Sequence, residues 1–428
     1  MRLDRLLKFI LVTLPLTNSV TLPLGFPLKL YELAGLVALG TLLLGGGVRL
    51  GRQARLPVLW GVFYFGSFLA SAWGFYVLMD LDLSMLEWAH GRYHPLANTV
   101  FHYLYLAFDI GLMVLVLHAL GQGLISLREF CRFWLYGSLL AVAYAVALNL
   151  VLAAGMPAAL LLRWDEVQYM NLGGLNVART GPFEEGNYFG FYLLASTVIT
   201  LWGTRRWPDR FFRIMLPVLL LGIVITASPA AMMGALLVVF AAVFSGGVPV
   251  PVRGAAIGGM VAAVAVLIQT GLFRTLVLDK FSLIFFGGVT DVTNVSLIQR
   301  MNESYHAWQM FLDYPFGIGM GNFGYFFGQY PDLYTWLISD FASFKRIANN
   351  IYLEVLCEHG IVIFGLFLYL LYAKVRRLLV AREFLVAAGL VLLCGYFLAF
   401  PTFRLSLIWV FWGYVIHLGR DAGRQHAR

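Results

Sequence analysis

Arg179 opens the first group of residues with clear chemical potential, in the stretch RTGPFEEGN. A Gly-Pro pair predicts a turn there, and Glu184 and Glu185 stand just before a long apolar run. A guanidinium beside a turn presents a planar fork to a phosphate, most strongly where water is partly excluded. The stretch predicts an anion-binding arginine. The alternative is that Arg179 only anchors the edge of the apolar run, while the acids favour a helix N-terminus.

Arg300 is a second candidate cation, in the stretch SLIQRMNESYHAW. Apolar residues recur there at three- to four-residue spacing, which predicts an amphipathic helix from Val295 to Tyr314 that Pro315 ends. Its apolar stripe consists of Leu297, Met301, Tyr305, Trp308 and Leu312. An arginine beside such a stripe is either an interfacial anchor or a ligand-binding cation. His306 is expected to be a solvated helix residue rather than a base.

A third group stands in ANNIYLEVLCEHG, where Asn350, Glu354 and Glu358 recur every four residues and so share one helix face. Acids at the head of an apolar helix are costly unless they face water or a partner, which makes this face a candidate site. The alternative is that Asn349 or Asn350 caps the helix and the acids remain at a polar boundary.

Long apolar runs must position these groups. Of the 428 residues, 61% are hydrophobic and 12% charged, and the mean hydropathy is +0.81. In soluble domains, roughly 45–50% of residues are hydrophobic and about 25% are charged. The composition excludes a soluble, disordered, collagen-like or disulfide-stapled chain. It predicts an all-α polytopic integral membrane protein with about 12 transmembrane helices, forming one transmembrane domain over residues 1–428.

The spans follow from windows of about 20 apolar residues. They are expected near 6–24, 28–46, 57–79, 98–120, 130–154, 187–203, 212–227, 229–245, 255–273, 350–373, 383–400 and 405–419. The N-terminal stretch has a basic start but no small-residue cleavage site, so it is expected to be a retained first span. Breaks at Ser228-Pro229 and between Pro401 and Arg404 leave open whether the flanking runs are separate or kinked.

The charges are distributed unequally between the two sides of the predicted membrane. Of the 30 lysines and arginines, 20 lie in segments on the side of the N-terminus. Of the 22 acids, only five lie there: Asp4, Glu129, Asp209, Glu383 and Asp421. Because cytoplasmic loops are enriched in basic residues, both termini are expected to be cytoplasmic. The excess of basic residues is spread over several short segments and forms no continuous basic stripe, so no nucleic-acid partner is expected.

The largest segment outside the predicted spans is an extracytoplasmic loop at residues 274–349, between spans 9 and 10. It contains the predicted amphipathic helix and GMGNFG (319–324), which matches G-x-G-x-x-G but opens no βαβ unit, so a dinucleotide site is excluded. Asp109, His118 and Asn149 are expected to form interhelical hydrogen bonds. The three cysteines lack the spacing of a disulfide framework or a metal site, so no metal is expected.

The order of these motifs over roughly residues 179–365 resembles the O-antigen polymerase/ligase superfamily. The matching residues are Arg179, Gly181, Phe183, Arg300, Trp308, Pro315, Gly317, Gly319, Gly321, Phe323, Asn350, Tyr352, Leu353, Glu354 and Gly360. Two positions depart from the family pattern. Asn349 stands where ligases typically carry histidine, and Ser228-Pro229 stands where Ser-Arg is usual.

The resemblance implies a GT-C-like membrane glycosyltransferase of the bacterial inner (plasma) membrane, acting on the extracytoplasmic face without cofactor, metal or nucleotide-sugar. The missing histidine favours a polysaccharide polymerase. Such an enzyme moves a glycan from undecaprenyl pyrophosphate to a sugar hydroxyl of another lipid-linked repeat unit, with inversion. Implied partners are the lipid-linked donor and acceptor, membrane lipid, a flippase and a chain-length regulator. The alternatives are a ligase acting on lipid A-core or protein, a lipid or polysaccharide transporter (flippase), and a non-enzymatic assembly subunit.

Under this resemblance each candidate residue takes a role. Cleaving the bond between the anomeric carbon and the pyrophosphate develops negative charge on the leaving group, which fixed cations stabilise. Arg179 and Arg300 are expected to bind the pyrophosphate. The acceptor hydroxyl is expected to be oriented or deprotonated by the face that carries Asn349, Asn350 and Glu354. Glu185, or its neighbour Glu184, is the reserve candidate for the base.

Overall fold

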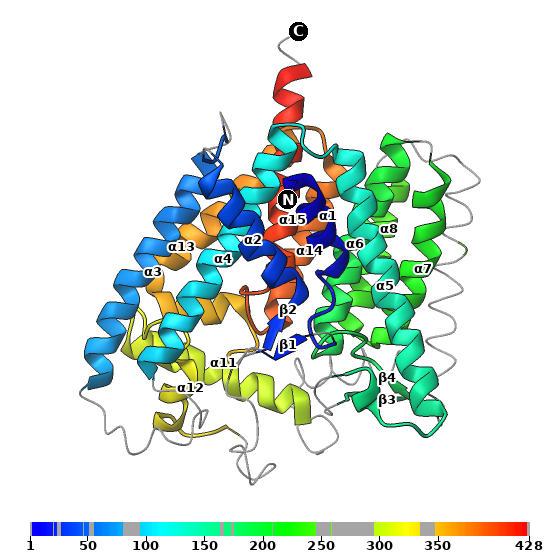
Figure 1. Cartoon of the computed structure of the whole chain (residues 1–428). Helices are drawn as coiled ribbons and strands as arrows, with labels where there is room; N and C mark the ends of the chain where they lie inside the picture. Colours follow the sequence, from blue (N-terminus) through cyan, green and yellow to red (C-terminus); the bar gives the residue numbers. More distant parts are fainter. Residues whose placement is uncertain are drawn as a thin grey trace.

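The computed structural model describes most of the chain. The described residues are 2–19, 21–23, 27–45, 47–50, 55–79, 95–162, 167–172, 175–207, 209–244, 258, 295–333 and 347–425. Most of them are helical, and the longer helices run alongside one another (Figure 1). Four helical stretches are long and apolar enough to cross a membrane: Arg55–Gly74, Ala97–Gly121, Leu127–Ala153 and Ile351–Val380. The chain is therefore a helical membrane protein, as the composition predicts.

The helix bounds follow the predicted spans closely over most of the described chain. The helices are α1 (Leu3–Thr13), α2 (Leu30–Leu44), α3 (Arg55–Met79), α4 (Pro95–Gly121), α5 (Leu127–Ala153), α6 (Gly186–Arg206), α7 (Arg210–Thr226), α8 (Pro229–Phe244), α11 (Val295–Asp313), α12 (Phe323–Phe326), α13 (Ile351–Val380), α14 (Phe384–Tyr396) and α15 (Ser406–Gln425). Short 3₁₀ turns lie at Ala158–Leu160, Phe327–Gln329 and Phe397–Ala399. The span predicted at 255–273 lies outside the described residues.

The prediction of a first span at 6–24 is wrong in its length. The helix α1 has only 11 residues and ends at Thr13, before Pro15, which cannot continue a helix. The chain then enters a two-stranded antiparallel hairpin, β1 (Thr21–Pro23) with β2 (Pro27–Lys29). A second hairpin pairs β3 (Tyr169–Leu172) with β4 (Leu175–Ala178). The described chain is thus mainly α, with two short hairpins that the apolar windows did not predict.

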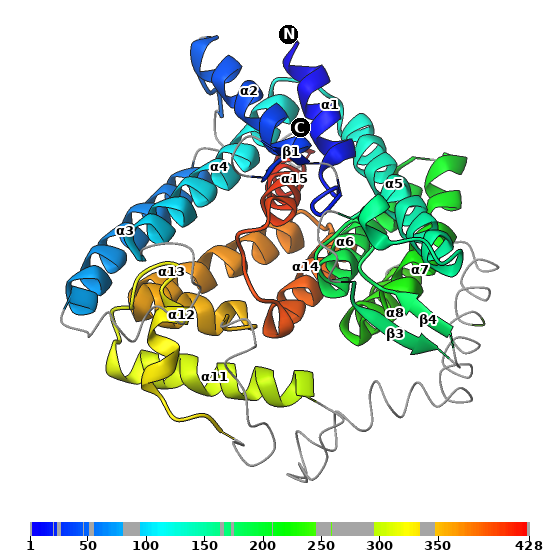
Figure 2. The same cartoon turned by 60° about the horizontal axis from the view of Figure 1, so that its bottom comes forward.

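Both open questions about helix breaks have answers in the structure. Ala227 takes a left-handed conformation (φ 48°) after α7, and α8 starts two residues later at Pro229, so these are two helices. Likewise, an irregular segment from Phe400 to Leu405 separates the 3₁₀ turn after α14 from α15. Residues from Ser406 to Leu418 of α15 are all buried, and this helix lies inside the bundle (Figure 2). A helix that is apolar on every side belongs in such a position.

Several polar contacts between helices lie together at one end of the bundle. Lys8 Nζ lies 2.9 Å from Glu129 Oε1, Arg132 Nη2 lies 2.5 Å from Asp209 Oδ2, and Trp202 Nε1 lies 2.7 Å from Glu383 Oε2. We call the end of the bundle that carries these contacts the basic end, and both chain termini lie toward it (Figure 1). We call the opposite end, across which α11 lies, the loop end (Figures 1 and 2).

Helix α13 is interrupted at Gly360, whose φ of 77° and ψ of 172° lie in a region that only glycine occupies readily. The loop after α11 hydrogen-bonds both sides of the break. Ile318 N donates to Cys357 O and Gly319 N to Glu358 O, both at 2.9 Å, while Pro315 O accepts from Ile361 N at 3.0 Å. The freed backbone groups are thereby satisfied, as the apolar interior requires. The glycine-rich loop therefore packs into the bundle, with Asn98 on α4 donating to Gly321 O at 2.7 Å.

Candidate functional site

Arg179 follows β4 directly and is fixed by backbone contacts on both sides. Its amide donates to Gln168 O at 3.0 Å. Asn149 on α5 donates to Ala178 O at 3.0 Å and accepts from Ala178 N at 2.8 Å, so Asn149 holds a strand rather than another helix. A Cβ added at Gly186 would lie 2.5 Å from Arg179 Nε. The glycine that starts α6 therefore leaves the room in which this guanidinium lies.

The Arg179 guanidinium meets a polar network that joins α6, α8 and α14. Its Nη2 donates to Asn187 Oδ1 at 3.4 Å. Ser228 Oγ lies 3.1 Å from the same Asn187 oxygen and 2.8 Å from the Tyr396 hydroxyl, which donates to Asn187 O at 3.0 Å. Nε of Arg179 is buried and has no hydrogen-bond partner among the described residues. The network fixes the guanidinium and leaves part of its donor capacity unused.

Arg300, on α11, lies in the same region. Its Nη1 donates to Ala399 O, just after α14, at 3.1 Å. Burial lowers the pKa of Arg179, and the charge of Arg300 is near enough to lower it further. In the described part of the chain, neither guanidinium forms an ion pair. We call Arg179 and Arg300 the arginine pair: two cations from distant segments for which the described residues show no ion pair. The nearby charge of Glu185 offsets part of the charge of Arg179.

A buried carboxylate, Glu303, lies one turn after Arg300 on α11 and is 2% exposed. Asn349 Nδ2 donates to its Oε2 at 2.5 Å and Gln299 Nε2 donates to its Oε1 at 2.8 Å. Burial raises the pKa of Glu303 to about 8, and the nearby charge of Glu185 acts in the same direction. Glu185 precedes α6 and is also within electrostatic range of Arg179. Three sequence candidates therefore lie near Glu303, namely Arg300, Asn349 and Glu185. Glu185 and Arg300 in turn lie within electrostatic range of Arg179.

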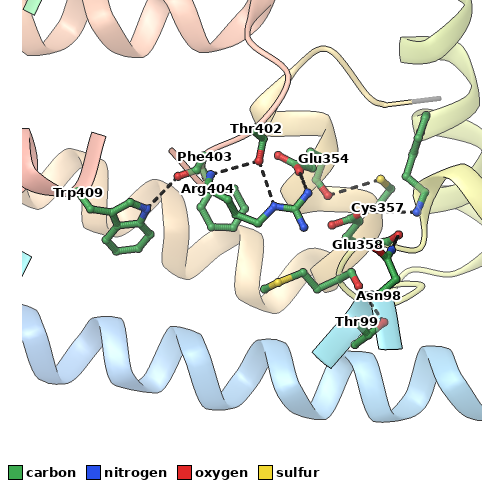
Figure 3. A network of polar contacts seen from close by, with 12 residues as sticks. Asn98, Thr99, Glu354, Cys357, Glu358, Thr402, Phe403, Arg404 and Trp409 are labelled. Atoms are coloured by element: carbon green, nitrogen blue, oxygen red, sulfur yellow. Dashed lines mark hydrogen bonds and ion pairs between the residues drawn. The ribbon is translucent and has the colours of Figure 1, made fainter. Parts of the chain in front are cut away.

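The other two candidates, Asn350 and Glu354, have different partners. Asn350 Oδ1 caps α13 by accepting from Tyr352 N at 3.0 Å and Leu353 N at 3.3 Å, which is the capping alternative. Glu354 is 3% exposed, and its Oε1 lies 2.8 Å from Arg404 Nη2. Figure 3 shows the two side chains pointing toward each other. We call Arg404 and Glu354 the buried ion pair. The alternative that the acid at Glu354 remains at a polar boundary is therefore wrong, because this carboxylate is inside the protein and paired.

Glu358 and His359 lie beside the buried ion pair. Glu358 accepts from Phe323 N at 3.4 Å, and Arg404 is near enough to interact electrostatically with it. Both ring nitrogens of His359 are buried without a hydrogen-bond partner among the described residues. Asp109 on α4 accepts from Ser406 Oγ of α15 at 2.5 Å, which confirms its predicted interhelical hydrogen bond. His118 instead accepts from the backbone amide of Arg49 at 3.1 Å.

The amphipathic helix predicted at 295–314 is confirmed as α11, but its buried face combines apolar Ile298, Ala307 and Met310 with polar side chains, and two residues of the predicted apolar stripe are exposed. Trp308 is 45% exposed and Leu312 54%, while Asn302, Glu303 and His306 are buried. The prediction of a solvated His306 is wrong, since its ring stacks on Phe327 at 4.0 Å between centroids. The buried face of α11 therefore carries polar side chains toward the protein.

Sequence reasoning missed Glu303, Asn187, Tyr396 and Arg404. Glu303 stands three residues after Arg300, so the two share a helix face, and this spacing was the available signal. Asn187 lies in the same stretch as Arg179, eight residues further on, but was given no role there. Tyr396 and Arg404 stand out by no spacing, because their partners are distant in sequence. Among the described residues, no group of three or more His, Cys, Asp or Glu side chains is arranged to hold a metal ion.

Comparison with known proteins adds no assignment. No protein-family model matches this sequence, and no curated protein matches it. The chemistry of the site must therefore be argued from the geometry of the arginine pair and its neighbours.

Proposed function

We propose that this chain is a membrane glycosyltransferase that polymerises a surface polysaccharide. It transfers a glycan from a polyprenyl pyrophosphate to the sugar hydroxyl of a second lipid-linked repeat unit, at the loop end of the bundle and on the extracytoplasmic face. The observation that carries the proposal is the arginine pair, which comes from two distant segments and has no ion-pair partner among the described residues. The motif order that resembles the O-antigen polymerase/ligase superfamily supports the same reading.

The arginine pair suits a pyrophosphate leaving group. Two guanidiniums that repel each other are stabilised when a multiply charged anion lies between them, and a planar fork binds phosphate oxygens with good geometry. As the anomeric C–O bond breaks, negative charge grows on the pyrophosphate, so cations already fixed in place stabilise the transition state more than the ground state. The arginines fill this role without a metal, and direct displacement inverts the anomeric centre.

The neighbouring residues position Arg179, the acceptor side of the site and helix α13. Asn187, Ser228 and Tyr396 hold Arg179 in position through the network that joins α6, α8 and α14. Asn349 lies on the acceptor side, next to α11. Asn350 and Glu354 act on helix α13, through its cap and through the buried ion pair, rather than on the acceptor directly.

A transporter of a lipid or polysaccharide intermediate is the second candidate. The observation that favours it is the interrupted helix α13, with Glu354 and Glu358 buried beside Arg404. Discontinuous helices and buried charges are typical of transporter sites. The O-antigen ligase is the nearer alternative, since it differs from the polymerase in its acceptor.

The test is reconstitution of the purified protein in vesicles with a polyprenyl-pyrophosphate oligosaccharide, followed by separation of products by size. A polymerase makes a ladder of repeat-unit multiples. Arg179→Ala should lower the rate by about 100-fold or more, the usual effect of losing one charge-stabilising donor. The matched control is Arg210→Ala, which removes an exposed arginine at the start of α7, at the basic end.

Each alternative has its own outcome. Transfer that appears only when lipid A-core or an acceptor protein is added identifies a ligase. Movement of the lipid-linked oligosaccharide across the vesicle bilayer without any new glycosidic bond identifies a transporter. A ladder that persists unchanged in both Arg179→Ala and Arg300→Ala would contradict the assignment of the arginine pair.

A further inference from the structure

We propose that Glu303 is the general base of the transfer reaction, and that Asn349 holds its carboxylate in position. This inference rests on the proposed glycosyltransferase function and names the residue that takes the proton from the acceptor hydroxyl. It begins from the buried face of α11, which carries the Glu303 carboxylate one turn away from a cation of the arginine pair.

The position of Glu303 meets the geometric requirement for a base. A base must lie beside the acceptor oxygen, on the opposite side of the reacting carbon from the leaving group, yet in the same site. Glu303 and Arg300 stand at i and i+3 on one helix, so a donor held by the arginine pair brings its reactive carbon near α11. Both described hydrogen bonds to the Glu303 carboxylate come from neutral amides, those of Asn349 and Gln299. Neither amide competes for a proton.

The electrostatic surroundings suit proton transfer near neutral pH. The charged groups that face Glu303 are Arg300 on its own helix and Glu185 at the start of α6. From the segment before α13 the facing group is the neutral Asn349. Burial raises the pKa of Glu303 to about 8. A base is most effective when its pKa lies close to the working pH, because it is then both available and strong enough.

The other carboxylates at this end are less suited to the role. Glu354 is occupied by Arg404 at 2.8 Å, and a proton placed on it would break the buried ion pair. Glu185 lies within electrostatic range of Arg179, where its charge compensates part of the arginine pair. Glu303 is the carboxylate near the arginine pair for which the structure shows two neutral hydrogen-bond donors.

The step balances in atoms and electrons. The acceptor O–H bond breaks and its proton goes to a Glu303 oxygen. The acceptor oxygen forms the new bond to the anomeric carbon with the electron pair of that O–H bond. The anomeric C–O bond to the pyrophosphate breaks, and its electron pair leaves with the pyrophosphate, whose charge the arginine pair stabilises. Glu303 then returns its proton to water or to the departing pyrophosphate.

The experiment compares wild type, Glu303→Gln, Glu303→Asp and Asn349→Ala in the reconstituted transfer assay. For each protein we would measure the single-turnover transfer rate across pH 5.5–9.5, and separately the equilibrium binding of polyprenyl-pyrophosphate oligosaccharide. Asp313→Asn is the matched control, since it makes the same carboxylate-to-amide change near the other end of α11, where Asp313 accepts from Tyr330.

The expected result separates chemistry from binding. Wild-type rate should rise with pH through a midpoint near 8. Glu303→Gln should lose about 100-fold or more in rate, and lose that rise, while it still binds the donor. Asn349→Ala should move the midpoint upward, because it removes a hydrogen bond that favours the charged carboxylate. Asp313→Asn should keep the wild-type rate and profile.

Two results would overturn the inference, and they differ from failure of the proposed function. If wild type transfers glycan and Glu303→Gln keeps its rate and pH profile, Glu303 is not the base and the glycosyltransferase assignment stands. If Glu303→Gln does not fold, Glu303→Asp decides, since an unshifted midpoint in that variant contradicts the inference. If wild type forms no glycosidic bond with any acceptor, the proposed function fails and this assignment fails with it.

Discussion

At the scale of single residues, Arg404 interacts with two buried carboxylates, a role that the sequence did not indicate. Arg404 is largely buried, its Nη2 lies 2.8 Å from Glu354 Oε1, and its Nε donates a second hydrogen bond to Thr402 Oγ1 at 3.1 Å. Figure 3 shows both contacts. It also lies within electrostatic range of Glu358. Removing one partner of a buried ion pair leaves an uncompensated charge away from water, which costs more than the pair contributes when intact.

The buried ion pair therefore gives an asymmetric prediction. Arg404→Gln should destabilise the protein by about 3–5 kcal/mol, and by more than Glu354→Gln, because it leaves both Glu354 and Glu358 without their cation. Thermal unfolding of the purified protein in detergent measures both. Lys8→Gln is the control, since Lys8 and Glu129 form a partly exposed pair that contributes about 1 kcal/mol or less. Equal losses for the two buried variants would contradict the shared role of Arg404.

Glu303 predicts a dependence of stability on pH that does not involve catalysis. Its folded-state pKa of about 8 exceeds the value of about 4.3 expected in an unfolded chain. Between these values the folded protein binds a proton that the unfolded chain has lost, so stability falls as pH rises from about 4.3 to about 8. Glu303→Gln removes this loss. Its unfolding temperature relative to wild type should increase from pH 5 to pH 8.5, and a constant difference would count against the raised pKa.

At the scale of elements, the break in α13 is a structural joint rather than a flexible point. The loop from Pro315 to Gly319 hydrogen-bonds the backbone on both sides of Gly360, so the two halves of the helix and the loop hold one another. The first half carries Asn350, Glu354 and Glu358, and its start lies beside Asn349. The angle of that half consequently controls where Asn349 meets α11.

Substitution of Gly360 tests this joint. A Cβ at Gly360 would lie 2.4 Å from Phe316 C, and its φ of 77° is strained for any other residue. Gly360→Ala should therefore lower stability by at least about 1–3 kcal/mol. Gly365, in the same helix, has open space around its Cα, so Gly365→Ala should be neutral or stabilise by up to about 1 kcal/mol. Both are measured by thermal unfolding, and similar melting temperatures for the two variants would contradict the model of the joint.

At the scale of the whole molecule, the two ends of the bundle differ in charge and in content. The basic end carries both termini and the arginine–aspartate contacts between α5 and α7 (Figure 1). The loop end carries α11, both members of the arginine pair, and the hairpin β3–β4. Because basic residues remain on the cytoplasmic side, the loop end is expected to face outward.

Cysteine labelling checks this orientation. Gln122, after α4 at the basic end, and Gln329, beyond α12 at the loop end, are both exposed. A membrane-impermeant maleimide added to intact cells should label Gln329→Cys and should label Gln122→Cys only after the membrane is permeabilised. The native chain, whose cysteines are buried or half-buried, measures the background. The reverse pattern would place the proposed site on the cytoplasmic side and contradict the use of an extracytoplasmic donor.

Most helix positions could be predicted from the sequence, because a segment of about 20 apolar residues must form its own backbone hydrogen bonds wherever it lies in the membrane. Local signals also located Arg179 beside its turn and Asn350 at its cap, since turns and caps depend on neighbouring residues. The hydropathy windows overestimated the length of the first span. The helix α1 ends at Thr13, just before Pro15, and a hydropathy average does not show that proline interrupts a helix.

The positions of side chains relative to distant segments needed the folded structure. Glu303 became a site candidate only because it lies on the buried face of α11, and a helical wheel shows the faces of a helix without showing which one contacts the protein. The partner of Glu354 is 50 residues away in the sequence, and that of Asn149 is 29 residues away. The network that holds Arg179 includes Ser228 and Tyr396, which are 168 residues apart. Such contacts depend on how whole helices pack, so no local pattern encodes them. The sequence thus predicted a helical membrane protein whose basic residues lie mainly on one side, whereas helix packing selected which charged side chains contact one another.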